Sequence, residues 1–235
     1  MKRIIICFFI SSTIFQSCSF STEALLEKAK TLMGQSKFHE AIDFLNKAIN
    51  ADDQNHEAFN TRGVAYFELK EFTNASLDYD RAIQLKPDFY RPYYNRALLK
   101  IAQNNTDGAL KDFAEAIKLN SKNAEIYVSR GQLLAALNQT DAALIDFREA
   151  VKYDTHNAAA WYNQGNLLFQ RELFEEAVSS FQTATKNDPS FGKAFHALGI
   201  AQLMQEQKDL GCLNLKQAQK LGYTSSKVAI EQYCQ

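Results

Sequence analysis

Small residues recur at intervals of 34 along most of this 235-residue chain. One ladder consists of Ala48, Ala82, Ala116, Ala150, Ala184 and Ala218. A second lies seven residues earlier, at Ala41, Ala75, Ala109, Ala143, Ala177 and Gly211. A third lies twelve residues before that, at Ala29, Gly63, Ala97, Gly131, Gly165 and Gly199. A single globular core has no reason to space small residues this way, whereas stacked two-helix units must leave room for each neighbour at the same places.

Large residues stand at helical spacing from these ladders. The first helix of each repeat has one four places before its small residue, at Leu25, Phe59, Tyr93, Tyr127, Trp161 and Phe195. In the second helix an aromatic residue separates the two alanines of repeats two to five, at Tyr79, Phe113, Phe147 and Phe181. Offsets of four and seven place these residues on one helix face. The pattern predicts two helices per repeat, with the aromatic ring between them.

Turn-forming residues separate the repeats. Pro87 and Pro189 follow the late alanine by five residues, and a proline cannot continue a helix. Asn120 and Asp154 begin the corresponding links elsewhere, while 104–107 and 138–141 are polar turns within repeats. These signals predict six repeats, at 22–55, 56–89, 90–123, 124–157, 158–191 and 192–225.

This pattern closely resembles the tetratricopeptide repeat (TPR) family. Repeat two reads Phe59, Arg62-Gly63, Tyr66, Ala75, Tyr79, Ala82, Pro87, and repeat five reads Trp161, Gln164-Gly165, Leu168, Ala177, Phe181, Ala184, Pro189. The resemblance implies an all-α fold, an α-solenoid of six TPR helix-turn-helix repeats. Arg62, Arg96 and Arg130 depart from it by replacing a leucine. We expect their aliphatic stems to pack between helices and their charged heads to reach water.

A capping helix is expected after the last repeat, within 226–235. Gly222 ends the preceding helix, and Thr224, Ser225 and Ser226 are available as caps for a helix over about 226–233. Its apolar residues Val228, Ile230 and Tyr233 are expected to cover the exposed end of the stack.

The first residues have the composition of a targeting segment. Lys2 and Arg3 precede an apolar run over 4–15, which is shorter than the about 20 residues that span a bilayer. The run leads into Ser17-Cys18 and resembles a bacterial lipoprotein signal, although Phe15 and Gln16 depart from the usual residues. The resemblance implies a signal peptide over 1–17, lipidation of Cys18 and a short linker over 18–21. The alternative is an ordinary signal peptide that is cut after Ser19.

Export would leave Cys212 and Cys234 in an oxidising compartment, where we expect them to form a disulfide. That bond would close a loop of about 23 residues and contribute about 3 kcal/mol in the chain-entropy model. The alternative is two unpaired thiols that act as small apolar residues in the terminal cap.

In TPR proteins the first helices line a concave face that holds ligands, and the resemblance assigns six positions of each repeat to it. The residues selected from these positions are Asn60, Arg91, Tyr94, Asn95, Ser129, Gln132, Tyr162, Asn163, Asn166, Gln170, Lys193 and His196. Amides and tyrosines can bond a peptide backbone, which favours a protein segment as ligand. The alternative is a set of solvated side chains. The fifth position of the repeats holds no lysine, which disfavours the carboxylate grip of chaperone-binding members.

Other classes of function find little support. The formal net charge is −1 and no basic run is present, which disfavours nucleic acid as a partner. His39, His56, His156 and His196 stand at four different repeat positions without metal-ligand spacing. The glycines are packing residues and form no phosphate-binding loop. We expect no enzyme, cofactor, metal or small-molecule substrate.

The prediction is therefore a non-catalytic protein-interaction scaffold of the bacterial cell envelope. Ser19 is unlike the aspartate that retains some lipoproteins at the inner membrane, which favours the outer membrane, facing the periplasm. Two alternatives remain open: a self-associating structural lipoprotein, and a soluble periplasmic adaptor.

Overall fold

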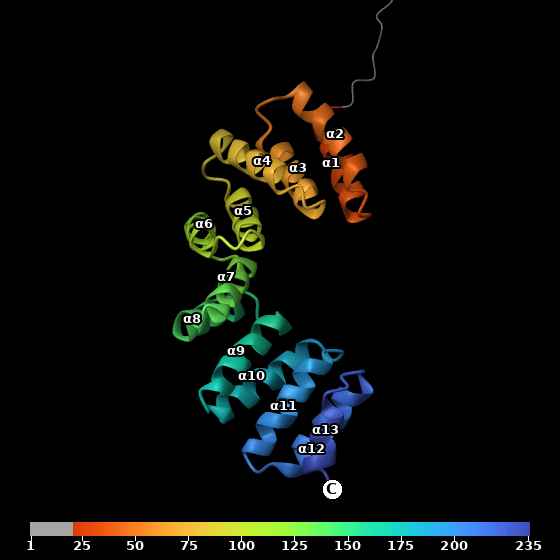
Figure 1. Cartoon of the computed structure of the whole chain (residues 1–235), viewed down its shortest axis with the longest axis vertical. Helices are drawn as coiled ribbons and strands as arrows, with labels where there is room; N and C mark the ends of the chain where they lie inside the picture. The colour runs from red at the N-terminus through yellow and green to blue at the C-terminus, as the bar shows by residue number, and fades with distance from the viewer. Residues whose placement is uncertain (1–20) are drawn as a thin grey trace, which may run out of the picture. The chain divides into compact units, whose positions relative to one another are not determined.

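The computed structural model describes residues 21–235, and within them it has thirteen helices and no strand (Figure 1). The all-α repeat fold predicted from the small-residue ladders is confirmed. The predicted signal peptide over 1–17 and the lipidation of Cys18 lie outside the described residues. Within the described part of the chain, no helix is both long and apolar enough to cross a bilayer.

The chain divides into two compact units, 1–78 and 79–235. The helices of the first are α1 (Thr22–Gly34), α2 (Phe38–Ala51), α3 (His56–Glu68) and the start of α4 (Phe72–Leu85). Here α1 packs on α2, and α2 packs on α3.

The second unit contains the remaining helices as a stack. They are α5 (Tyr90–Ala102), α6 (Thr106–Leu119), α7 (Ala124–Ala136), α8 (Thr140–Tyr153), α9 (Ala158–Gln170), α10 (Phe174–Asn187), α11 (Gly192–Met204), α12 (Lys208–Lys220) and α13 (Ser226–Tyr233). Each repeat contributes one antiparallel pair, such as α5 with α6, and its second helix contacts the first helix of the next pair (Figure 1). Consecutive helices therefore make most of the contacts, as expected of a solenoid.

The small-residue ladders mark the places of closest approach. All six alanines of the late ladder, from Ala48 to Ala218, are 0% exposed. A Cβ atom on Gly165 would lie 2.6 Å from the Phe181 ring, and one on Gly199 would lie 2.8 Å from the Gly211 carbonyl oxygen. Contacts under 3.0 Å cannot be accommodated without movement, so the ladders record steric limits between helices.

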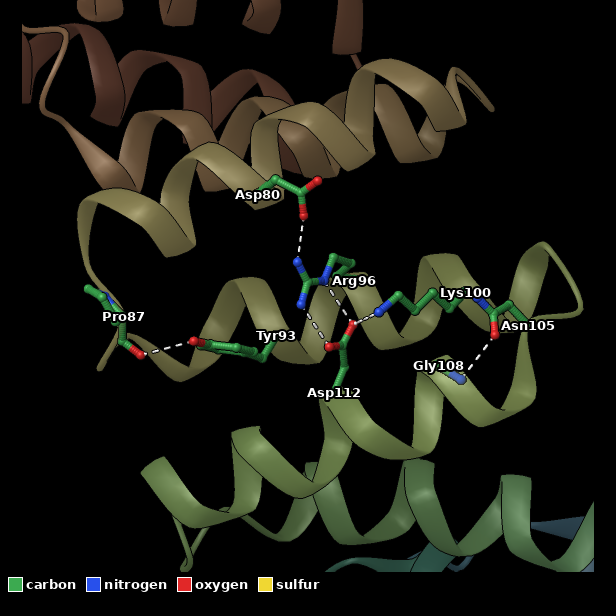
Figure 2. Close-up of polar contacts among 8 residues, drawn as sticks. All are labelled: Asp80, Pro87, Tyr93, Arg96, Lys100, Asn105, Gly108 and Asp112. Carbon is green, nitrogen blue, oxygen red and sulfur yellow. Dashed lines mark hydrogen bonds and ion pairs between the residues drawn. The ribbon is translucent and has the colours of Figure 1, made fainter.

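In repeats three to five, the large residue near the start of the first helix also joins that helix to the preceding link. The Tyr93 hydroxyl donates to the Pro87 carbonyl oxygen at 3.2 Å (Figure 2). Tyr127 donates to the Ser121 carbonyl oxygen at 3.1 Å, and the Trp161 indole donates to that of Thr155 at 2.9 Å. Each bond joins residues six positions apart, so the same contact recurs at the start of repeats three, four and five.

The turns inside the repeats share a left-handed residue. Its φ lies between 58° and 63° at Ser36, Lys70, Asn104, Asn138, Glu172 and Glu206. In the third repeat the next residue, Asn105, caps α6 by accepting the Gly108 N–H at 3.0 Å (Figure 2). Asparagine tolerates a left-handed backbone better than lysine or glutamate does, so only the turns at 104–107 and 138–141 were evident from sequence.

Buried ion pairs hold the three arginines that replace the family leucine. Arg62, Arg96 and Arg130 each bind, through Nε and Nη2, an aspartate sixteen residues later on the second helix, namely Asp78, Asp112 and Asp146. The aspartate side chains are only 7%, 6% and 2% exposed. The buried carboxylates that hold the charged heads were not predicted, while the arginine side chains themselves keep 19%, 20% and 25% of their surface exposed.

The C-terminal helix α13 is fastened at both ends. A disulfide joins Cys212 of α12 to Cys234, with the two Cα atoms 5.6 Å apart. At the other end the buried Ser226 hydroxyl lies 3.0 Å from His196 Nδ1 of α11, and Ser225 makes no side-chain capping bond. Val228 is 67% exposed, so the expectation that it covers the stack is wrong.

The residues of α13 that face inward are smaller than expected. Ala229 is 8% exposed and Ser226 is 0% exposed, whereas Tyr233 is 37% exposed. The bonds at the two ends set the rotation of this short helix, and they turn its small face toward α12 rather than its bulky one.

Candidate functional site

A hollow of about 190 Å³ opens between α9 and α11 in the second unit. Its lining consists of Tyr162, Asn166, Phe169, Phe181, Lys193, His196, Ala197, Ile200 and Tyr223. The Tyr162 ring forms the floor, with centroids 5.8 Å from the Phe181 ring and 5.0 Å from the Phe191 ring. We call this hollow the aromatic pocket.

Two nitrogen-bearing side chains complete the aromatic pocket. The Lys193 ammonium lies 5.3 Å from the Tyr162 ring centroid, within the range of a cation–π contact. The His196 ring lies 5.0 Å from the Tyr223 ring, and its Nδ1 lies 3.0 Å from the Ser226 hydroxyl. Burial lowers the pKa of His196 below its ordinary value, so the imidazole is neutral at pH 7. The pocket thus combines an apolar floor with one cation.

A second hollow of about 260 Å³ adjoins the first, and we call it the amide pocket. It is lined by Gln132, Ala135, Phe147, Asn163, Asn166, Leu167 and Gln170, so Asn166 belongs to both. Its four carboxamides, on Gln132, Asn163, Asn166 and Gln170, have no hydrogen-bond partner among residues 21–235. Each carboxamide offers two donors and an acceptor to a ligand.

Tyr94 joins α5 to α7 on the same side of the repeats. Its hydroxyl lies 3.1 Å from the Glu125 carboxylate and 3.2 Å from the Ser129 hydroxyl. Burial raises the pKa of Tyr94 to about 12, so the hydroxyl stays protonated and donates. Two predicted residues, Tyr94 and Ser129, therefore meet, but they satisfy each other.

The other predicted residues lie outside the two pockets. Arg91 is exposed at the start of α5, 5.8 Å from the Phe89 ring centroid and 5.9 Å from that of Tyr90. Asn95 is half-buried on α5. Asn60 belongs to the first compact unit and is 6% exposed. Their contact with a partner stays a prediction.

Sequence reasoning missed the apolar half of the aromatic pocket. Phe169, Ala197 and Ile200 stand at groove-lining repeat positions of α9 and α11, but only the polar residues at such positions were selected. Reading the same positions for apolar side chains would have found all three. Tyr223 follows α12 and does not stand at a groove-lining position of a repeat.

Within residues 21–235, no three histidine, cysteine, aspartate or glutamate side chains gather as a set of metal ligands. The chemistry available at the two pockets is therefore hydrogen bonding by amides, apolar contact and attraction by one ammonium group. These interactions suit recognition of a bound segment.

Family models described as tetratricopeptide repeat match this chain at 22–55, 56–89, 94–158, 130–191 and 162–209. The matches cover well over half of the sequence, and the helical pairs described above occupy the same ranges. The chain belongs to the tetratricopeptide repeat family, whose repeat domains are typically non-catalytic protein-interaction scaffolds.

Similar curated proteins share a limited part of the chain. Human RNA polymerase II-associated protein 3 is 33% identical over 87 residues, which is 37% of this chain and 13% of that protein. The Schizosaccharomyces pombe heat shock protein sti1 homolog is 26% identical over 87 residues, 37% of this chain and 15% of that protein. The chain thus spans less than a fifth of the length of either relative.

Solved structures share the fold over most of the chain. PilF of Pseudomonas aeruginosa superposes with a TM-score of 0.79 at 14% identity, covering 88% of this chain and 97% of that one. YrrB, described as a TPR protein with an unusual peptide-binding site, superposes with a TM-score of 0.66 at 21% identity, covering 80% and 97%. At these identities the likeness concerns the fold alone.

Proposed function

We propose that this protein is a scaffold of the bacterial cell envelope that holds an extended segment of a partner protein along α7, α9 and α11. The observation that carries the proposal is the amide pocket, with its four free carboxamides, directly beside the aromatic pocket. An extended backbone presents alternating donors and acceptors, which is the pattern that carboxamides can bond.

The sizes of the two pockets favour a segment over a small molecule. Their volumes, about 190 and 260 Å³, are below the roughly 300 Å³ at which small-molecule sites begin. Each suits one or two side chains. An apolar anchor residue would enter the aromatic pocket while the adjoining backbone crosses the amide pocket, and Lys193 would favour an acidic neighbour of the anchor. YrrB, whose fold is similar, has a peptide-binding site of its own.

Site-specific photocrosslinking tests this surface. A benzophenone side chain introduced at Asn166, which both pockets share, should capture a partner in intact cells. The same side chain at Ser179, exposed on α10, is the matched control and should capture nothing. Equal adducts from both positions, or none from Asn166, would contradict the proposal.

Alanine variants then separate binding from folding. Asn163→Ala with Asn166→Ala removes two carboxamides that make no internal bond, so stability should be unchanged while partner recovery falls at least tenfold. A control pair, Ser179→Ala with Gln182→Ala, changes exposed residues of α10 and should recover partner as wild type does. Equal recovery with both pairs would rule out the amide pocket as the binding surface.

We further propose that Cys18 is lipidated and holds the array at the outer membrane, on its periplasmic side. Only residues 19–21 separate that cysteine from α1, so the repeats would stay close to the bilayer. Incorporation of labelled palmitate that is lost in Cys18→Ser, together with outer-membrane fractionation, is the expected result. An unlabelled wild-type protein in the periplasmic fraction would indicate the soluble adaptor instead.

A further inference from the structure

The guanidinium nitrogen Nη1, which does not bind the buried aspartate, has a partner in repeats two and three but, among the described residues, none in repeat four. Arg62 donates through Nη1 to Asn46 Oδ1 at 2.6 Å, and Arg96 donates through Nη1 to Asp80 Oδ1 at 2.5 Å (Figure 2). Asn46 and Asp80 are 34 residues apart, and the next residue in that series is Ala114. Alanine has no acceptor, so Arg130 Nη1 has no partner among residues 21–235.

The residues that surround Arg130 are mostly apolar. A hollow of about 370 Å³ lies over the Arg130–Asp146 pair, and its walls are Leu110, Leu134, Ala142 and Ile145. Ile145 is an exposed apolar residue, with 60% of its surface accessible. We call this hollow the outer groove. Its residues belong to α6, α7 and α8, and none of them lines the aromatic or amide pocket.

Repeat three has two lysines and a glycine at the equivalent positions. The residues 34 positions before Leu134, Ala142 and Ile145 are Lys100, Gly108 and Lys111. Lys100 places its ammonium 2.6 Å from Asp112, inside the network of Arg96 (Figure 2). Three changes in one repeat thus convert a charged surface into an aliphatic groove with a single hydrogen-bond donor at its base, which is a usual composition of a ligand site.

We propose that the outer groove binds a partner segment that presents an aliphatic side chain beside a neutral amide oxygen. The side chain packs against Leu110, Leu134 and Ile145, and the oxygen accepts from Arg130 Nη1. It thereby occupies the place that Asn46 fills in the second repeat.

Charge balance favours a neutral amide oxygen over a carboxylate as the acceptor from Arg130 Nη1. Where the acceptor is the carboxylate of Asp80, Lys100 supplies a second cation, so two cations face two anions. Where it is the amide of Asn46, Arg62 and Asp78 balance each other alone. Leu134 replaces that lysine in repeat four, so a carboxylate would leave a net negative charge in a half-buried groove, which is unfavourable.

Methyl NMR of the full-length protein in detergent, with N-acetyl-leucine methylamide as probe, tests this assignment. The probe carries one aliphatic side chain and two neutral amide oxygens, and its size sets an expected Kd of about 1 mM. Saturable shifts of the Ile145 methyl groups are expected. N-acetyl-leucine, whose carboxylate is charged, should bind about tenfold more weakly. Absent shifts, or equal binding of both probes, would overturn the proposal.

Ala114→Asn introduces an amide that should compete with the probe for Arg130. The new amide should reach Arg130 as Asn46 reaches Arg62, and it should weaken the probe about tenfold. Lys111→Asn, on the same helix and also exposed, is the control and should leave the Kd unchanged.

Unaltered probe binding in Ala114→Asn would overturn the proposal. So would methyl shifts that depend on protein concentration without probe, because they would place a second copy of this chain in the groove. The readout is confined to α8, so its failure is distinguishable from a failure of crosslinking at Asn166.

Discussion

Repeats three and four, residues 90–157, differ from repeats five and six, residues 158–225, in how they join their paired helices. The first two use buried ion pairs, Arg96 with Asp112 and Arg130 with Asp146. At the same positions the later repeats have Gln164 with Ser180 and Leu198 with Asn214. Both partners change together, which is expected because either charge alone would be buried and uncompensated.

Among the described residues, most free polar groups of the inner surface lie in repeat five, where Asn163, Asn166 and Gln170 line the amide pocket. In repeats three and four Tyr94, Glu125 and Ser129 bond one another. Farther along, the carboxamides of Asn163 and Asn166 find no partner within residues 21–235 and border an apolar hollow. One backbone thus carries two kinds of repeat, one with a buried ion pair between its helices and one without it, and three of the four free carboxamides of the described residues lie on a repeat of the second kind.

Asp112→Ala should have the largest effect on stability. It leaves Arg96 and Lys100 without the buried carboxylate that both contact, and removing one partner of such a pair costs roughly 3–5 kcal/mol. Ser180→Ala, at the same position of repeat five, should cost less than about 1 kcal/mol because the Ser180 hydroxyl bonds only the Glu176 carbonyl oxygen. Urea unfolding midpoints measure both, and equal losses would end the distinction between the two kinds of repeat.

Cys234→Ser should act at the other end of the array. The disulfide joins residues separated by 22 positions, and closing a loop of this size is worth about 3 kcal/mol. Contacts in a solenoid are local, so hydrogen exchange should rise in α11 to α13 and stay unchanged in α5 to α8. A uniform rise along the chain would show that the repeats unfold as one unit and do not differ in this respect.

The fold could be predicted from the sequence because residues that pack in the same way recur at a constant spacing in a repeat array. A residue such as Gly165 is small for one reason, the ring of Phe181, and that reason recurs every 34 residues. The ion pairs were not evident, although Asp112 and Asp146 stand in register. The partner of an arginine on one helix depends on the turn that brings the second helix back.

The candidate site was predicted in part for a similar physical reason. Polar residues such as Asn166 and His196 could be assigned to the inner face, because they stand at the positions that line the groove in TPR proteins. Phe169 and Ile200 stand at groove-lining positions too but were not selected, because an apolar residue on a first helix suits the core equally well. The prediction of which face of α13 is buried was wrong. A helix of eight residues has too few apolar positions for its pattern to outweigh the bonds at its two ends.

An ion pair introduced into repeat five tests whether that repeat accepts the arrangement found in repeats three and four. Gln164 Oε1 is buried without a hydrogen bond among the described residues, and it stands where Arg130 stands in repeat four. Gln164→Arg and Ser180→Asp should each destabilise the protein alone, because each buries a lone charge. Together they should recover about 1–2 kcal/mol of the summed loss in a double-mutant cycle. Additive losses would show that the repeat cannot accept the pair.

The smallest effect is expected at the left-handed turn residue, where the two kinds of repeat differ again. Repeats three and four place Asn104 and Asn138 there, whereas the later repeats place Glu172 and Glu206. Glu172→Gly removes the Cβ clash of a residue at φ 61° and should stabilise the protein by about 0.5–1 kcal/mol, part of the gain being offset by the flexibility of glycine when unfolded. Asn138→Gly, at φ 58°, should gain less, because asparagine already tolerates this backbone. Thermal midpoints of the two variants give the order directly. An equal or larger gain at Asn138 would mean that the turns of the two kinds of repeat carry the same strain, and that the difference between them lies only in the helix pairs.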